Sequence, residues 1–119
     1  MVTLYWYPKC STCQKAKKWL ENNQIEVEYI DLVSQTPSAE TIKNWLATSE
    51  VPIRRFFNTS GQKYREQGLK DLVASYTLDE ASQKLSSDGM LIKRPILVKD
   101  GQFLTNGFKE SDYAEVLSK

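Results

Sequence analysis

The chain has 119 residues, a length that fits a single domain with an adequate hydrophobic core. Its 16 basic and 15 acidic residues leave a net charge of +1, and this near balance argues against direct nucleic-acid binding, which usually requires a clear positive excess. The absence of histidine excludes histidine-based catalysis and histidine metal ligation by this chain, so any chemistry must use other side chains.

The first third predicts a strand, a helix and a second strand. Residues 2–7 are short and rich in β-branched and aromatic side chains, a composition typical of a buried strand. A helix over about residues 11–23 follows, and three of its residues are spaced to face inward: Cys13, Ala16 and Leu20. Residues 26–32 alternate in polarity and predict the second strand. The helical crossover is long enough for the two strands to be parallel.

The middle of the chain, about residues 36–89, predicts a mostly helical segment. A helix start signal at residues 36–38 precedes a helix whose spacing buries Ile42, Trp45 and Leu46. Further on, Thr77 and Glu80 have the spacing of a capping box that opens another helix.

The last third predicts two strands and a helix. Residues 94–98 and 102–105 form the strands, and Asp100-Gly101 between them is a strong two-residue hairpin signal. The final helix is expected to bury Tyr113, Val116 and Leu117. The element order predicts an α/β fold, with residues 1–119 forming one domain that carries a helical insert at about residues 36–89.

The two cysteines, Cys10 and Cys13, form a Cys-x-x-Cys pair between the first strand and its helix. In a β-α-β context this spacing is the signature of a thioredoxin-like redox motif. Free amide groups and the helix dipole at a helix start stabilise a thiolate, Lys9 adds positive charge, and Ser11 and Thr12 complete the motif. We interpret Cys10 as the attacking thiol because it precedes the helix, and Cys13, one turn inward, as the resolving thiol.

The compartment supports a redox role for the pair. Residues 1–7 are apolar without a basic segment, and Pro8 interrupts them too early for a signal peptide, so we expect a cytoplasmic protein without membrane association. In the cytoplasm a disulfide is more often catalytic or redox-sensing than structural. Two alternatives stay open: inert buried cysteines, or half of a zinc site, which would need two further ligands.

Basic residues elsewhere are candidates for binding an anion. Arg94 and Pro95 begin the third predicted strand, where a cis proline would lie beside the Cys10 loop and Arg94 would lower the pKa of Cys10 or hold an oxyanion. A solvated arginine at a strand end is the equal alternative. Arg54-Arg55 and Lys63-Arg65 are typical of a solvated surface, although residues 58–61 between them offer hydrogen-bond donors. Whether one of Phe56 and Phe57 is exposed stays open.

Taken together, these motifs resemble the arsenate reductase (ArsC)/Spx family over essentially the whole chain. The motifs that carry the resemblance are residues 5–13, 56–61, 64–65 and 93–96. The resemblance implies a thioredoxin-like (glutaredoxin-like) fold, in which a four-stranded mixed sheet carries the helical insert. It also implies a cis proline at Pro95 and a position for Arg94 near the catalytic cysteine.

The chain departs from the glutaredoxin-coupled arsenate reductases at their cations. Those enzymes have a histidine four residues before the cysteine and an arginine four residues after it, where this chain has Trp6 and Gln14. Their further oxyanion arginines fall near Asn58 and Asn106. Cys13 instead supplies an internal thiol partner, a feature shared with the Spx/MgsR-like branch.

The resemblance implies two functions. The first is a thiol–disulfide oxidoreductase, a relative of the arsenate reductases, in which Cys10 attacks and Cys13 resolves. It would hold no cofactor or metal and would use glutathione, glutaredoxin or thioredoxin as an external thiol donor. The alternative is a redox-sensing transcriptional regulator of the Spx type that binds the α subunit of RNA polymerase.

Overall fold

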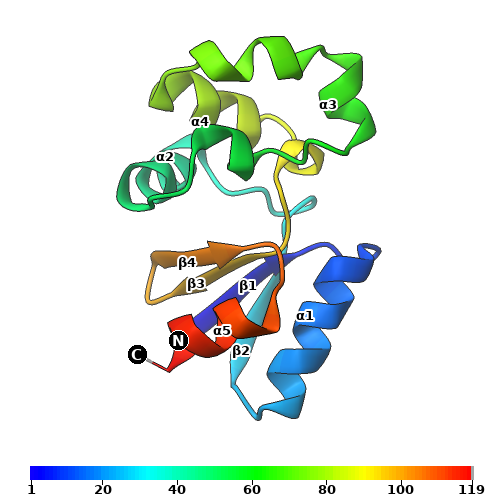
Figure 1. Cartoon of the computed structure of the whole chain (residues 1–119), viewed down its shortest axis with the longest axis vertical. Coiled ribbons are helices and arrows are strands. Elements are labelled where there is room, and N and C mark those ends of the chain that lie inside the picture. The colour runs from blue at the N-terminus through cyan, green and yellow to red at the C-terminus, as the bar shows by residue number, and fades with distance from the viewer. Residues whose placement is uncertain (119) are drawn as a thin grey trace. The chain divides into compact units, whose positions relative to one another are not determined.

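Figure 1 shows the computed structural model of the protein, which describes residues 1–118. The chain divides into two compact units. Unit 1 combines residues 1–31 with residues 94–118, and unit 2 comprises Leu32–Lys93. Unit 2 includes the predicted insert, and its bounds lie a few residues outside the expected ones. That the chain forms one domain stays a prediction.

Unit 1 contains a four-stranded mixed sheet in the order β2-β1-β3-β4. Strand β1 (Val2–Trp6) pairs in parallel with β2 (Val27–Asp31), and helix α1 (Ser11–Asn22) makes the crossover between them. Strand β3 (Ile96–Lys99) is antiparallel both to β1 and to β4 (Gln102–Asn106). The predicted four-stranded mixed sheet is therefore confirmed.

The hairpin between β3 and β4 turns at Asp100 and Gly101, as predicted. Their φ angles are 52° and 81°, so both residues adopt the left-handed conformation that a type I′ turn requires. Glycine adopts it without steric cost, and aspartate tolerates it better than most side chains. The amino group of Met1 forms an ion pair with Asp100 at 2.6 Å, which ties the start of the chain to this turn.

Helices α1 and α5 (Glu110–Leu117) pack on the same face of the sheet of unit 1 (Figure 1). Five fully buried side chains from the two helices, β1 and β3 form the centre of this core: Leu4, Ala16, Leu20, Leu97 and Tyr113. The Tyr113 hydroxyl donates a hydrogen bond to the Gly107 carbonyl at 2.8 Å, so its polar atom is satisfied inside the core. This packing holds α1, and the cysteines at its start, against the sheet.

Unit 2 is helical. Its elements are α2 (Ala39–Thr48), η1 (Ile53–Phe56), α3 (Gln62–Glu66), η2 (Leu69–Asp71), η3 (Val73–Ser75), α4 (Leu78–Ser86) and η4 (Gly89–Leu91), where η marks a 3₁₀ helix. As predicted, α2 buries Ile42, Trp45 and Leu46. Phe56 and Phe57 are both buried, with exposed fractions of 0% and 1%, which answers the question that the sequence left open.

The start of α4 supports a stability prediction. The Thr77 hydroxyl accepts a hydrogen bond from the Glu80 N–H at 3.1 Å, and the Glu80 carboxylate accepts one from the Thr77 N–H at 2.9 Å. We expect Thr77→Ala to lower the free energy of unfolding by about 1 kcal/mol, because it leaves a helix-start amide without its acceptor. Urea denaturation measures this loss.

Thr48→Ala is the matched control for this substitution. The Thr48 hydroxyl is exposed and bonds only to the Asn44 carbonyl within its own helix, so its removal should change stability little. Equal losses in the two variants would contradict the capping argument.

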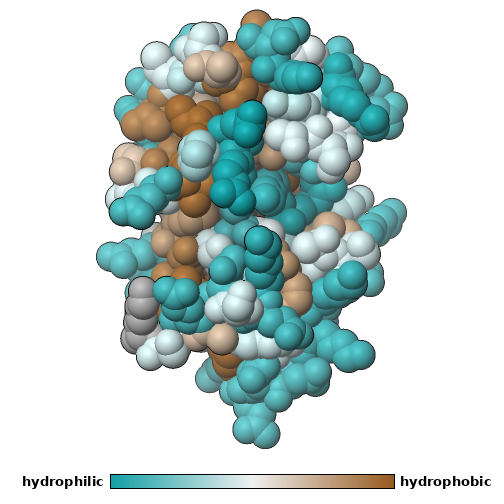
Figure 2. Space-filling view, in the orientation of Figure 1, coloured by the Kyte–Doolittle hydropathy of each residue, from teal (hydrophilic) through white to brown (hydrophobic). Residues whose placement is uncertain are grey.

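Most of the face shown in Figure 2 is hydrophilic. Over the described residues, the large hydrophobic side chains that are exposed are Met1 and Leu72. None of the helices within residues 1–118 combines the length and the apolar composition needed to cross a membrane.

Candidate functional site

The candidate site lies where β1 ends and α1 begins. Cys10 is the N-cap residue of α1, and its N–H donates to the Tyr7 carbonyl at 2.9 Å, which closes the turn after the strand. The Gln14 N–H donates to the Cys10 carbonyl at 3.0 Å and starts the helix. The Gln14 side-chain amide also donates to the Pro8 carbonyl at 2.7 Å, so the loop before Cys10 is held at both ends.

The two cysteines lie together as free thiols with different environments. Cys10 is half-buried, whereas Cys13 is fully buried on the inner face of α1. The Cys13 thiol hydrogen-bonds the Cys10 sulfur, and the Tyr7 N–H donates to the Cys13 sulfur at 3.4 Å. This arrangement suits a pair in which one thiol meets a substrate and the other waits behind it.

Several groups favour the thiolate of Cys10. Burial raises its pKa, but hydrogen bonds from the backbone and thiol of Cys13 and from the backbone of Thr12, together with the Arg94 charge, more than compensate. The pKa of Cys10 is therefore lowered from its ordinary value. Cys10 forms no conventional side-chain cap, yet the amides that favour its thiolate are those that a helix start leaves without internal partners.

Cys13 has the opposite tendency. Burial raises the pKa of the Cys13 thiol to about 12, against the lowering effect of the Tyr7 N–H. This value includes the raising effects of the hydrogen bond to Cys10 and of the Cys10 thiolate charge, and the lowering effect of Arg94. At neutral pH Cys13 is therefore protonated, and its hydrogen bond to Cys10 favours the thiolate form of that neighbour.

Arg94 lies in the same unit as the cysteines, and its positive charge acts on both sulfurs. Its guanidinium carbon lies 5.3 Å from the centre of the Tyr7 ring, within the range of a cation–π contact. The Arg94–Pro95 peptide bond is cis, as the family resemblance predicts. The arrangement favours the electrostatic interpretation of Arg94 over that of a solvated strand end.

The other residues of the predicted site are placed as follows. Ser11 is the first residue of α1 and is exposed, whereas the Thr12 backbone lowers the pKa of Cys10. Lys9 is exposed and is not among the groups that shift the pKa of Cys10. The structure therefore identifies the amides by which the helix start lowers the pKa of Cys10. It identifies no such effect of Lys9.

Arg94→Gln is expected to raise the pKa of Cys10, because it removes a positive charge that favours the thiolate. Since the thiolate is the reactive form, the pH profile of Cys10 alkylation by iodoacetamide should move to higher pH, and alkylation at neutral pH should slow. Lys9→Gln, which removes a positive charge next to Cys10 in sequence, should leave the profile in place. Equal shifts in the two variants would contradict a specific role for Arg94.

Two tyrosines near the cysteines were not predicted as part of the site. Tyr7 contributes an N–H to Cys13 and a ring to Arg94. Burial raises the pKa of Tyr113, and the charge of Cys13 raises it further, so this core hydroxyl stays protonated beside the pair. No sequence pattern identifies the contact of the Tyr7 ring with Arg94 or the effect of Cys13 on Tyr113, because both depend on how distant segments pack.

The described residues include no cluster that could bind a metal ion. The two positions near the cysteines at which the related reductases have cations are occupied here by Trp6 and Gln14. No group of three or more cysteine, aspartate and glutamate side chains within residues 1–118 could hold a metal ion. Trp6 packs against Tyr29 with ring centres 5.5 Å apart and lies under the Lys17 ammonium, and Gln14 is bonded to Pro8. Among the described residues, the positive charge that lowers the pKa of both cysteines is that of Arg94.

A half-exposed thiol paired with a buried one at a helix start, on a four-stranded mixed sheet, defines a protein of the thioredoxin-like class. Comparison with known proteins gives the family. The model of the ArsC family matches residues 5–116, and the chain belongs to this family.

The names of the similar proteins do not agree on one function. The uncharacterized protein YusI of Bacillus subtilis (strain 168) is 50% identical over 114 residues, which cover 96% of each chain. The regulatory protein MgsR of the same organism is 30% identical over 118 residues, covering 99% of this chain and 91% of MgsR. The crystal structure of a possible arsenate reductase from Streptococcus mutans UA159 has a TM-score of 0.91 at 47% identity, over 96% of this chain and 98% of that one.

Proposed function

We propose that the protein is a thiol–disulfide oxidoreductase in which Cys10 is the nucleophile and Cys13 the resolving thiol. The observation that carries the proposal is the contrast between the two sulfurs: the pKa of half-exposed Cys10 is lowered, and that of buried Cys13 is raised to about 12. This contrast supports the two roles, because the thiolate is the attacking form and the exposed sulfur is the one that a substrate reaches.

In the first step the Cys10 thiolate attacks one sulfur of a substrate disulfide. A bond forms between Cys10 and that sulfur, the substrate disulfide bond breaks, and the other substrate sulfur leaves as a thiolate. The product is a mixed disulfide on Cys10. The amides of Thr12 and Cys13 and the charge of Arg94 lower the pKa of Cys10 and keep it available as the thiolate for this step.

In the second step Cys13 gives its proton to solvent water and attacks the Cys10 sulfur. The substrate thiolate leaves, and a Cys10–Cys13 disulfide forms, so two electrons have passed from the protein to the substrate. The first step prepares the second, because a Cys10 in disulfide linkage has neither the charge nor the hydrogen bond that raise the pKa of Cys13. The Tyr7 N–H and Arg94 still favour the Cys13 thiolate.

An external thiol donor completes the cycle. Glutathione, glutaredoxin or thioredoxin would return two electrons to the disulfide and restore both thiols, and the chain itself needs no bound cofactor. A reducing compartment such as the cytoplasm supplies these donors. A disulfide suits the site better than arsenate as substrate, because Trp6 and Gln14 stand where the related reductases have cations.

Stoichiometric oxidation tests the proposal. The reduced protein is mixed with one equivalent of a small disulfide, such as bis(2-hydroxyethyl) disulfide, and analysed by mass spectrometry and thiol titration. The expected product has lost two hydrogens and both titratable thiols, with no substrate group attached. A protein that keeps both thiols under these conditions would contradict the proposal.

The alternative function is a redox-sensing regulator, which the similarity to the regulatory protein MgsR over almost the whole chain favours. In this role the Cys10–Cys13 disulfide would switch binding to the α subunit of RNA polymerase. A pull-down with the carboxyl-terminal domain of that subunit, using oxidised and reduced protein, tests it. Binding that depends on the oxidation state supports the regulator, and no binding in either state removes it.

A further inference from the structure

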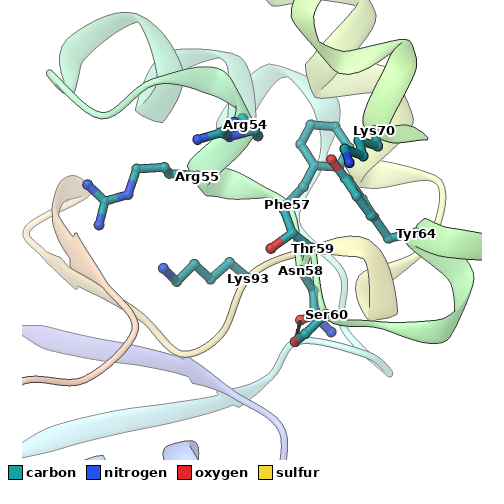
Figure 3. Close-up of a pocket in the computed structure, with 9 residues that line it drawn as sticks. All are labelled: Arg54, Arg55, Phe57, Asn58, Thr59, Ser60, Tyr64, Lys70 and Lys93. Atoms are coloured by element: carbon teal, nitrogen blue, oxygen red, sulfur yellow. Dashed lines mark hydrogen bonds between the residues drawn. The ribbon is translucent and has the colours of Figure 1, made fainter. Parts of the chain in front are cut away.

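Unit 2 has a pocket of about 650 Å³ that the thiol chemistry does not use. Its lining comes from η1, the loop after it, α3, η2 and the end of the unit: Arg54, Arg55, Phe57, Asn58, Thr59, Ser60, Tyr64, Lys70 and Lys93 (Figure 3). All nine residues belong to unit 2. A volume of this size is typical of a small-molecule site.

The charge of this pocket is one-sided. Four of its nine lining residues are cationic and none is acidic, although the whole chain has 16 basic and 15 acidic residues. Within residues 1–118, neither Arg54 nor Lys70 takes part in an ion pair. Concave surfaces lined by a single sign of charge focus the field and attract ions of the opposite sign. This distribution of charge favours an anionic ligand.

The local structure explains why these cations meet. The Phe57 N–H donates to the Arg54 carbonyl at 3.1 Å, which closes the η1 turn that presents two successive arginines. The Lys93 N–H donates to the Phe56 carbonyl at 2.9 Å, and this bond brings the end of the unit beside η1. Figure 3 shows the Arg54, Arg55 and Lys93 side chains on one side of the pocket and Lys70 beside Tyr64 on the other.

Neutral donors complete the lining. The loop that follows Phe57 contributes the side chains of Asn58, Thr59 and Ser60, and the Ser60 hydroxyl donates to the Asn58 side-chain oxygen Oδ1 at 3.2 Å. This bond leaves the Asn58 amide nitrogen as a donor. Phe57 and Tyr64 are only 1% and 4% exposed, so their rings form a floor and offer no open face on which a base could stack.

We propose that this pocket binds a small molecule with two or more phosphate charges, such as a diphosphate or a phosphate ester. Arginine forks, an ammonium group and hydroxyl donors match the many acceptor oxygens of a phosphate group. The pocket volume is about twenty times the roughly 30 Å³ that one water molecule occupies, so it accommodates more than a single inorganic phosphate. The inference is independent of the redox function proposed for Cys10 and Cys13.

The contrast with Lys63 and Arg65 supports this assignment. These residues form the other basic pair near the loop, yet neither lines the pocket. Lys63 forms an ion pair with Asp88. Arg65 is exposed on α3, as Arg54 and Arg55 are on η1, but it lies outside the pocket that those two arginines line. The structure thus separates two basic pairs that look equivalent in the sequence.

Isothermal titration of the full chain with pyrophosphate, inorganic phosphate and tricarballylate tests the proposal. We expect saturable binding of pyrophosphate, with inorganic phosphate and the tricarboxylate each about tenfold weaker or more. In the double variant Arg54→Gln and Lys70→Gln, the Kd for pyrophosphate should rise at least about tenfold, because charge-assisted hydrogen bonds are lost.

A second double variant, Lys43→Gln and Arg65→Gln, is the matched control. It removes the same charge from exposed residues outside the pocket, so its Kd should stay within about twofold of the parent value. NMR should show pyrophosphate-dependent shifts of the Thr59 and Ser60 amides. Absence of saturable binding, equal weakening in both double variants, or equal affinity for the tricarboxylate would overturn the proposal.

Discussion

Cys10→Ser is expected to lower the turnover of a small disulfide substrate by at least about a thousandfold. Serine keeps the shape of the side chain at the start of α1, but its hydroxyl does not ionise near neutral pH. The amides and the Arg94 charge that stabilise a thiolate there would have no nucleophile to act on. Steady-state disulfide reduction with a coupled thiol donor measures the loss.

The thermal unfolding midpoint of this variant serves as its control. Cys10 is half-buried and forms no side-chain cap in the thiol state, so its replacement should leave the midpoint close to that of the parent. A variant that folds normally and retains turnover within about tenfold of the parent would refute Cys10 as the nucleophile.

The elements that could be predicted from the sequence are those with local signals. The Cys-x-x-Cys helix has its periodic inner face, and the Asp100-Gly101 turn needs two left-handed residues that these side chains tolerate. Thr77 and Glu80 satisfy each other within one turn of chain. In each case the energy that decides the structure comes from neighbours a few residues apart.

Burial in irregular segments was harder to predict. Phe56 ends a 3₁₀ turn, and Phe57 begins an extended segment that bridges to Ile92, so the backbone changes conformation between them and both rings face inward. Neither helical nor strand periodicity describes this change. Val116 and Leu117 were predicted to be buried but are only partly so, because they lie in the last turn of a short helix.

The candidate site likewise has one part that local sequence signals predict and another that depends on contacts between distant segments. The two cysteines meet because they are three residues apart, so their proximity is a local property. Arg94 joins them through sheet register: Tyr5 pairs with Ile96 in the antiparallel β1–β3 ladder, which brings the chain before β3 toward Tyr7 at the end of β1. Sequence alone does not determine that register, so the element order left Arg94 equally open to a role at Cys10 and to a solvated strand end, and the family resemblance favoured the first.

The anion pocket was harder still to predict from the sequence. Arg54, Lys70 and Lys93 are far apart in the chain and meet only because unit 2 folds its short helices around Phe57 and Tyr64. A pair of arginines is typical of a solvated surface, and what distinguishes this pair is the pocket that it lines, which has no acidic residue in its lining.

Cys13→Ser is expected to stop the reaction after its first step. Serine can still donate a hydrogen bond to the Cys10 thiolate, so attack on a substrate disulfide should continue, but a hydroxyl does not displace the substrate from the mixed disulfide. With excess disulfide and no thiol donor, mass spectrometry should find one substrate-derived group on Cys10, removable by dithiothreitol. The parent protein should instead lose two hydrogens and carry no such group.

The comparison of the two products separates a resolving Cys13 from a merely buried one. If Cys13 only fills the core, the parent and the variant should accumulate the same adduct on Cys10, because nothing within the chain would release the substrate. If Cys13 resolves, the adduct persists only in the variant, since the buried thiol lies against Cys10 and loses two of the causes of its high pKa once the mixed disulfide forms. An adduct that persists equally in the parent would therefore contradict the two-thiol mechanism while leaving Cys10 as the nucleophile.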